Sequence, residues 1–280
     1  LDGGLVRVWD GGRRRYAPTE RIRHELPSFS PQFSPDGQRL LTAPDGRTAQ
    51  VWDASTGQPA GAPLRHTDWL NTATFSPNGL WVVTGSSDGT ARVWDAGSGQ
   101  PVSDPLRHEG LVLSAAFSPE GYRVVTASKD QTARIWDANT GQAIGGPLVH
   151  EDWVRTAEFS PDGRWVVTAS RDGTARVWDA LTSLAVVAPL RHHAQVNAAE
   201  FSPDGRWVLT ASEDGTARVW SVRTGHPVID PVHHEESSVR SAAFSPDGRS
   251  VISTSGEKAW IWDARSGQNV GEPLQGDGAL

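Results

Sequence analysis

Short runs of apolar and β-branched residues alternate with turn signals along the chain, and residues 154–180 show the pattern. The run VRTAEFS (154–160) precedes a turn with proline and glycine, and RWVVTAS (164–170) precedes the shorter turn RDG. Proline and glycine favour tight turns, whereas β-branched and aromatic residues favour strands. TARVWDA (174–180) is a third strand, and stretches such as AIGGPLVH (143–150) supply a fourth. The pattern predicts four short strands joined by tight turns.

Both faces of the second strand in this pattern carry apolar or small residues. One alternating set is Trp165, Val167 and Ala169, and the other is Val166, Thr168 and Ser170. A strand of this kind is covered on both faces, as it is where four-stranded sheets pack face to face in a ring. Because no segment keeps a helical period over ten residues, we expect an all-β protein.

The same pattern recurs at a fixed interval. RDGTARVWDA (171–180) has close copies at 87–96, 129–138 and 213–222. The tryptophans of this pattern are separated by 43 residues once and by 42 residues five times, at Trp9, Trp52, Trp94, Trp136, Trp178, Trp220 and Trp262. Aspartate follows six of these seven tryptophans, and the exception is Ser221. A period of this length indicates a repeat architecture rather than a copied active site.

The repeated string, with its tryptophan–aspartate pair and a histidine upstream, resembles the WD-repeat (WD40) β-propeller family over essentially the whole chain. The resemblance implies one all-β propeller domain, residues 1–280, with four-stranded antiparallel blades, usually seven. We expect half a blade in residues 1–23 and complete blades in 24–65, 66–107, 108–149, 150–191, 192–233 and 234–275. A seven-bladed ring with two strands outside this segment is favoured over a six-bladed ring with a loose N-terminal ribbon.

Histidine, aspartate and threonine recur at fixed distances before the repeated tryptophan, at 28, 6 and 10 residues in the central repeats. These residue types also form nucleophilic relays. An active site has no reason to be copied in every repeat, however, and the resemblance implies a structural hydrogen-bonded tetrad in each blade. The expected tetrads are His66, Thr84, Asp88 and Trp94; His108, Thr126, Asp130 and Trp136; His150, Thr168, Asp172 and Trp178; and His192, Thr210, Asp214 and Trp220.

The first and last complete repeats depart from this spacing. The first has Gly46 at the aspartate position, with Asp45 one place early. The last is one residue shorter and offers Glu257 instead. We therefore expect these two blades to be less stable than the central ones.

Function is expected where the repeats differ. By resemblance, the third and fifth residues after the histidine and the residue before the aspartate point to the face on which WD-repeat proteins bind partners. The candidate partner-binding residues are Trp69, Leu111, Lys129, Trp153, Arg155, Arg171, Gln195, Glu213 and Arg240. Because tryptophan and arginine are frequent binding hot spots, one hypothesis is a basic groove floored by tryptophan that holds an acidic or phosphorylated peptide. The alternative is that Trp69 and Trp153 only cover loop backbone.

Two further groups of strand residues have different expected roles: tryptophans that pack between blades, and glutamates that a catalytic site would need. Trp81, Trp165, Trp207 and Trp260 lie within strands and are expected to pack between blades. A propeller enzyme with a site in the central channel would need acids on the inner strands, where Glu158 and Glu200 are the exceptions among small and apolar residues.

The composition limits the class of protein, the kinds of partner and the kinds of site that the chain can have. Of the 280 residues, 37% are hydrophobic and 21% charged, which is typical of a globular protein. A formal charge of −7 argues against nucleic acid or an anionic membrane as a partner. The chain has no cysteine, so it has no disulfide or thiolate metal site, and no run of about 18 apolar residues.

Short motifs for other activities have better explanations. GSSDG (85–89) fits a nucleophile elbow but lies in a predicted hairpin rather than a strand-to-helix turn. The pairs His192–His193 and His233–His234 lack a third metal ligand at a suitable spacing. We therefore expect no cofactor and no metal.

The sequence as a whole predicts a non-catalytic scaffold for protein–protein interaction, with a channel enzyme or a purely structural spacer as alternatives. The chain also has no methionine, so it is expected to be an excised or processed segment of a larger protein. The expected localisation is cytoplasmic. Such near-identical repeats resemble those of bacterial multidomain regulators, in which propellers accompany kinase or NTPase domains.

Overall fold

The computed structural model describes residues 5–6, 22–23, 31–234 and 238–275. His24, the first histidine of the repeat series, and most of the predicted half blade lie outside these residues. The chain divides into two compact units, which we call unit 1 (residues 1–126 and 136–143) and unit 2 (residues 127–135 and 144–280).

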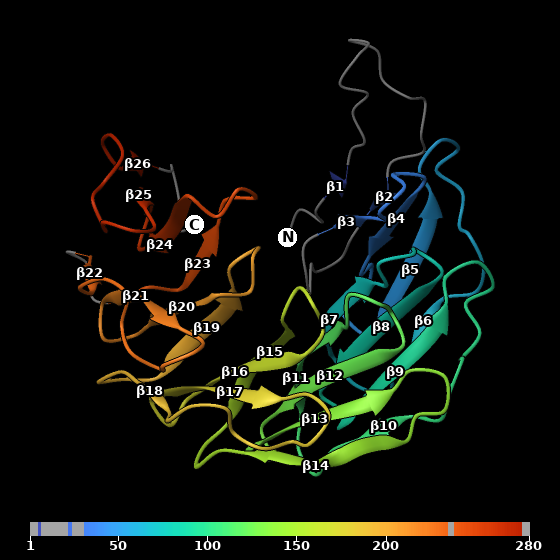
Figure 1. Ribbon diagram of the computed structural model, residues 1–280. Helices are drawn as coiled ribbons and strands as arrows, with labels where there is room; N and C mark the ends of the chain where they lie inside the picture. Colours follow the sequence, from blue (N-terminus) through green and yellow to red (C-terminus); the bar gives the residue numbers. More distant parts are fainter. Residues whose placement is uncertain (1–4, 7–21, 24–30, 235–237, 276–280) are drawn as a thin grey trace. The chain divides into compact units, whose positions relative to one another are not determined.

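Antiparallel strands form every sheet, and the described residues contain no helix (Figure 1). A two-stranded sheet pairs β1 (Leu5–Val6) with β2 (Ile22–Arg23). Unit 1 contains the sheet β3 (Gln32–Phe33), β4 (Arg39–Thr42), β5 (Thr48–Asp53) and β6 (Leu64–Arg65), and the sheet β7 (Leu70–Phe75), β8 (Trp81–Ser86), β9 (Thr90–Asp95) and β10 (Leu106–Arg107). The next sheet, through which the unit boundary passes, consists of β11 (Val112–Phe117), β12 (Arg123–Ser128), β13 (Thr132–Asp137) and β14 (Ala143–Val149).

Unit 2 contains three further four-stranded sheets, which can be followed from β15 to β26 in Figure 1. They are β15 (Val154–Phe159), β16 (Trp165–Ser170), β17 (Thr174–Asp179) and β18 (Leu190–Arg191); β19 (Val196–Phe201), β20 (Trp207–Ser212), β21 (Thr216–Ser221) and β22 (Val232–His233); and β23 (Ser241–Phe244), β24 (Ser250–Ser255), β25 (Lys258–Asp263) and β26 (Leu274–Gln275). The predicted all-β fold of four-stranded antiparallel sheets is confirmed. The number of blades in a closed ring stays a prediction.

The second strand of the central sheets is buried on both faces. In β16 the five residues after Trp165 are all buried, whichever way their side chains point. One face belongs to a core that includes the next sheet, in which Val167 and Val177 share a hydrophobic cluster with Val196 and Phe201. Both faces of β16 can be buried because neither of its two alternating sets of side chains contains a charged residue.

The first strand of several sheets begins with a β-bulge. In β15 the register shifts between Val154 and Thr156, so Arg155 is the extra residue. The same shift places Asn71 in the bulge of β7 and Asn197 in the bulge of β19. Bulges redirect a side chain away from the regular alternation of a strand. These three residues are the fifth residues after the repeat histidine, so a backbone feature sets the direction of that variable position.

Candidate functional site

A chain of hydrogen bonds runs through the sheet β15–β18. His150 Nε2 lies 2.7 Å from Thr168 Oγ1, and His150 Nδ1 lies 2.9 Å from Asp172 Oδ2. The Trp178 indole N–H donates to the Thr168 hydroxyl over 2.9 Å. The strands β16 and β17 bring threonine and tryptophan together, while the loop before β15 and the β16–β17 hairpin supply histidine and aspartate.

Ionisation states fix the direction of this chain in the equivalent sheets. Burial lowers the pKa of His192 to about 4, although the Asp214 carboxylate opposes the change. Burial by itself raises the pKa of Asp88, but hydrogen bonds from Thr90 and His66 outweigh burial and hold it at about 2. At neutral pH the histidine is therefore neutral and the aspartate ionised. Nδ1–H then donates to the carboxylate, and Nε2 accepts the threonine hydroxyl proton.

The other central sheets contain the same bonds. In unit 1, His66 Nε2 lies 2.7 Å from Thr84 Oγ1, with Trp94 donating to that oxygen over 2.8 Å. In β19–β22, His192 lies 3.0 Å from Asp214 and 2.7 Å from Thr210, to which Trp220 donates over 2.9 Å. The third sheet has the bonds His108 Nε2–Thr126 Oγ1 (2.7 Å) and Trp136 Nε1–Thr126 Oγ1 (2.8 Å).

A second threonine, which the predicted tetrads did not contain, extends each of these chains of hydrogen bonds. The Thr174 hydroxyl donates to Asp172 Oδ1 over 2.6 Å, and Thr216 binds Asp214 at the same distance. Thr90 and Thr132 bind Asp88 and Asp130 in the same way. The signal was present in the repeated DGT and DQT strings, two residues after each aspartate.

The first and last four-stranded sheets contain different hydrogen bonds around the repeated tryptophan. In β3–β6, Trp52 donates to Thr42 over 2.9 Å, and Asp45, one place early, accepts the Thr48 hydroxyl over 2.9 Å. In β23–β26, Ser253 takes the threonine position, with bonds to His234 Nε2 (2.7 Å) and Trp262 Nε1 (3.0 Å).

Among the described residues of the last sheet, no carboxylate is bonded to the histidine. His234 Nδ1 is buried and has no hydrogen-bond partner there, and Glu257 is exposed. A buried polar atom without a partner costs about 1 to 3 kcal/mol. This cost gives a physical reason for the expected lower stability of that blade.

Two of the variable positions adjoin each other in three sheets. The backbone N–H of the residue before the aspartate donates to the carbonyl of the third residue after the histidine. The pairs are Arg171 to Trp153 (2.9 Å), Ser87 to Trp69 (2.8 Å) and Glu213 to Gln195 (3.0 Å). The scaffold therefore places two side chains that differ from blade to blade next to each other.

Three of the predicted partner-binding residues gather at one point of unit 2. The Lys129 Nζ lies 3.9 Å from the centroid of the Trp153 ring, and the Arg171 Cζ lies 4.8 Å from it. We call these three residues the Trp153 cluster. The Asp152 Oδ2 lies 3.9 Å from Arg171 Nε, and both side chains are largely exposed. An exposed pair at this distance is weak, so the Arg171 guanidinium can exchange Asp152 for the anion of a partner.

The remaining candidates are separate from this cluster. Trp69 is 43% exposed in unit 1, and Leu111 is half-buried there. Arg155 is half-buried and makes no hydrogen bond or ion pair with described residues, whereas Asn197 at the same bulge position donates to Val239 O over 3.0 Å.

The chemistry changes in the following sheets. Gln195 and Glu213 take the places of Trp153 and Arg171 in the next sheet, and the Gln195 amide donates to the Glu213 carboxylate. An amide and an acid therefore stand where the preceding sheet has tryptophan and a cation. Arg240 is exposed one sheet further on. The basic character is therefore concentrated at Lys129, Trp153 and Arg171.

Two glutamates on the first strands of neighbouring sheets have raised pKa values. Solvent reaches the Glu158 side chain, yet desolvation by the surrounding protein, with the charge of Glu200 added, raises its pKa to about 8. Burial also raises the pKa of Glu200, against a hydrogen bond of 2.5 Å from Phe244 N.

We expect Glu158→Gln to raise the melting temperature more at pH 9 than at pH 5. A carboxyl with a raised pKa contributes stability that is present below its ordinary pKa of 4.5 and is lost as pH rises through 8. Discounted for the solvent that reaches the side chain, the gain at pH 9 is about 1 kcal/mol, or about 2 to 4 °C. Thermal unfolding at pH 5, 7 and 9 measures it, with the exposed Glu272→Gln as control. An equal effect at all three pH values would contradict the account.

Neither a metal site nor a membrane span is apparent in the part of the chain that the structure describes. No group of three or more histidine, aspartate or glutamate side chains there could hold a metal ion. None of the described residues belongs to a helix long and apolar enough to cross a bilayer.

Comparison with known proteins gives a family match and a structural match. Five segments, residues 61–95, 99–137, 147–179, 184–221 and 225–263, match the family model described as "WD domain, G-beta repeat". A crystal structure of the computationally designed Ika8 protein superposes with a TM-score of 0.84 at 27% sequence identity, covering 99% of this chain and 83% of that one. No curated protein sequence matches the chain.

Proposed function

This chain belongs to the WD40-repeat family, and from that premise we propose that it is a non-catalytic interaction module whose Trp153 cluster binds a partner peptide. WD40 repeats are in general scaffolds for protein–protein interaction. The observation that carries the proposal is that Lys129 and Arg171 both lie over the Trp153 ring. All three residues stand at positions that differ between repeats whose other residues are nearly the same.

The repeated residues are better suited to support than to chemistry. Thr168 is fully buried, and its hydroxyl already accepts from Trp178 and donates to His150. A nucleophile must reach its substrate and lose its proton to a base that then acts on the substrate. A hydroxyl held in this way satisfies the indole N–H instead, which is a requirement of every blade.

The Trp153 cluster favours an acidic or phosphorylated peptide. Two cations held on the same ring repel each other, and an anion between them relieves the repulsion. Arg171 offers a planar donor group that can bind a carboxylate or phosphate through two hydrogen bonds, and the partly exposed indole adds apolar contact. Residues of this kind are the anchors of many peptide-binding surfaces.

Selection from a random peptide display library tests the proposal without knowledge of the natural partner. We expect peptides selected on the native chain to be enriched in aspartate or glutamate, and to lose binding to the Lys129→Glu/Arg171→Glu variant. The Arg65→Glu/Arg249→Glu variant has the same charge change on exposed arginines outside the cluster and should retain them. Selected peptides that bind both variants equally would refute the assignment of the cluster.

A further inference from the structure

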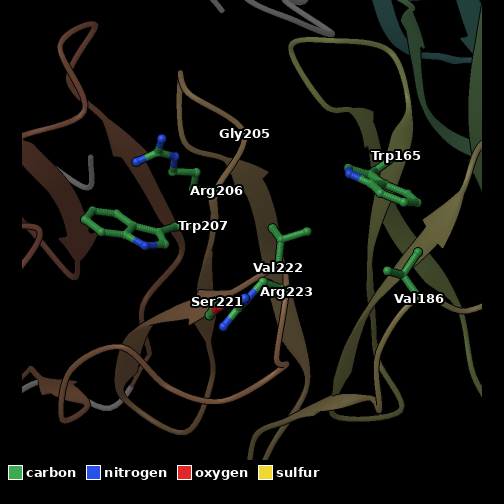
Figure 2. A pocket seen from close by; sticks show the side chains of 8 residues that line it. All are labelled: Trp165, Val186, Gly205, Arg206, Trp207, Ser221, Val222 and Arg223. Atoms are coloured by element: carbon green, nitrogen blue, oxygen red, sulfur yellow. The ribbon is translucent and has the colours of Figure 1, made fainter.

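A groove of about 540 Å³ lies between the sheets β15–β18 and β19–β22, at the end opposite to the Trp153 cluster. Trp165 begins β16, whereas Arg171 directly follows the end of the same strand. Figure 2 shows Trp165 and Val186 on one side of the groove and Trp207 with Arg206 on the other, with Val222 and Arg223 between them. Four apolar side chains and two cations thus line the groove, and none of its lining residues carries a carboxylate.

Ser221 also lines the groove, and it is the residue at which this repeat departs from the others. The other described sheets carry aspartate at this position, after the repeated tryptophan: Asp53, Asp95, Asp137, Asp179 and Asp263. The carboxylate closes the turn that follows. Asp179 Oδ1 accepts hydrogen bonds from Leu181 N (3.0 Å), Thr182 N (2.8 Å) and the Thr182 hydroxyl (3.0 Å).

The turn after Ser221 keeps its backbone shape but lacks this acceptor. Gly225 N donates to Ser221 O over 2.8 Å, as Ser183 N does to Asp179 O over 2.9 Å in the preceding sheet. The Ser221 hydroxyl makes no hydrogen bond within the described residues, and the N–H of Arg223, the counterpart of Leu181, has no acceptor there. The Thr224 N–H, the counterpart of that of Thr182, donates to Ser221 O over 3.3 Å, so the Arg223 N–H is the backbone donor that a bound anion would take.

The positive charges of the groove are left largely without acidic partners. Val222 N donates to Arg206 O as Ala180 N donates to Arg164 O, each over 3.0 Å, so Arg206 is the counterpart of Arg164. Hydrogen bonds from Thr182, and further the charge of Arg164, lower the pKa of Asp179. Arg206 has no such aspartate. Its Nε lies 3.8 Å from Asp204 Oδ2, with both side chains mostly exposed.

The neighbouring hollow shows that this charge pattern is specific to one place. A space of about 420 Å³ on the other side of Trp207 is lined by Arg249 and Arg265, but also by Asp204 and Asp247. Arg249 Nε lies 4.0 Å from Asp247 Oδ2. Cations and carboxylates are balanced there, whereas the charged lining residues of the Trp165–Trp207 groove are the two arginines Arg206 and Arg223.

We propose that the Trp165–Trp207 groove binds a peptide in which an acidic side chain neighbours an aromatic or aliphatic one. The peptide carboxylate takes the place that aspartate has in the other repeats, beside the Arg223 N–H and the guanidinium groups of Arg206 and Arg223. The apolar side chain lies between the two tryptophans and the two valines. This site uses none of the residues of the Trp153 cluster, so it holds or fails independently of the function proposed above.

The probe is a capped tetrapeptide Gly-Asp-Phe-Gly with an amidated end, compared with Gly-Asn-Phe-Gly and Gly-Asp-Ala-Gly. NMR of ¹⁵N-labelled protein follows the indole N–H signals, which Trp165→Phe and Trp207→Phe variants assign. We expect the Asp-Phe peptide to shift both signals, with affinity at least tenfold higher than that of either control peptide. Equal affinity for the Asn-Phe peptide, or no shift of either signal, would overturn the proposal.

Ser221→Asp provides a variant that should fold at least as well as the native chain, because it restores the residue of the other repeats. Its own carboxylate competes with that of the ligand, so affinity for the Asp-Phe peptide should fall at least tenfold. Ser221→Ala leaves the position without a carboxylate and should bind like the native chain. Unchanged binding to Ser221→Asp would show that the peptide carboxylate does not occupy this position and would overturn the proposal.

Discussion

Asp172→Ala is expected to lower the free energy of unfolding by about 2 to 4 kcal/mol. The substitution removes the acceptor of both the His150 Nδ1–H and the Thr174 hydroxyl, and all three side chains are almost fully buried. Leaving a buried donor without a partner costs about 1 to 3 kcal/mol. Thermal and denaturant unfolding should show a melting temperature at least about 5 °C lower.

Asp230→Ala is the matched control. Asp230 is exposed and makes no hydrogen bond or ion pair with the described residues, so its removal should change stability by less than about 0.5 kcal/mol. Equal stability of Asp172→Ala and Asp230→Ala would show that the hydrogen-bonded chains do not support the blades.

Gly99→Ala is expected to destabilise unit 1 by about 2 to 5 kcal/mol. Gly99 lies in the turn between β9 and β10 with a φ of +72°, and a Cβ there would lie 2.1 Å from Ala62 O of the preceding turn. Ala62 N also donates to Ser98 O over 2.9 Å, so the two turns are tied together. An added methyl group therefore meets backbone that cannot turn aside.

Gly37→Ala separates strain from collision. Gly37 has a similar φ of +69°, but nothing lies within 4 Å of its Cβ position, so only the left-handed backbone is penalised, by about 1 to 2 kcal/mol. Denaturant unfolding of both variants should give a clearly lower midpoint for Gly99→Ala. Equal midpoints would mean that consecutive sheets of unit 1 are not packed as closely as the structure has them.

Much of the fold could be predicted because the same pattern of strand and turn residues recurs in each repeat. Strand two has no polar face, which predicted its coverage on both sides, and the tight turns marked the strand ends. Fixed spacing singled out Thr168 and Trp178, the family resemblance implied that they are bonded, and the indole donates to that hydroxyl in the structure. Hairpin register explains why spacing works, since each residue of β16 has a set partner on β17.

The same reasoning missed Ser253 because the spacing rule counts through a hairpin of constant length. In the last sheet Ser255 pairs directly with Lys258, so the hairpin is one residue shorter and the hydroxyl lies nine residues before Trp262 instead of ten. Counted from the start of the strand, Ser253 has the same place as Thr168. Hydrogen-bond positions follow strand register, not distance along the chain.

Side-chain arrangements at the variable positions could not be predicted, because they depend on rotamers and on neighbouring blades. The sequence indicated that Trp153, Arg171 and Lys129 share an edge, but not that both cations lie over one ring. Ser221 was visible as an exception in the repeat. Its meaning depends on the turn hydrogen bonds that Asp179 makes and on the groove beside it.

Two classes of residue follow from this proposal: residues shared by the repeats hold the blades, and residues that differ between the repeats are proposed to bind a partner. Asp172 and Arg171 are adjacent in the sequence and in the same hairpin, yet belong to the two classes. Asp172 is buried within the hydrogen-bonded chain, whereas the Arg171 side chain is 48% exposed. Substitution at one should change folding, and at the other binding.

Titration of a labelled library-selected peptide by fluorescence anisotropy, with melting temperatures measured on the same samples, tests this separation most directly. For Lys129→Glu/Arg171→Glu the account predicts at least about a tenfold weaker Kd, since two charged hot-spot contacts of more than 1 kcal/mol are reversed, at a melting temperature within about 2 °C of the native value. Native affinity in this variant, or a loss of affinity that only follows a loss of folding, would contradict the claim that the Trp153 cluster is the binding surface.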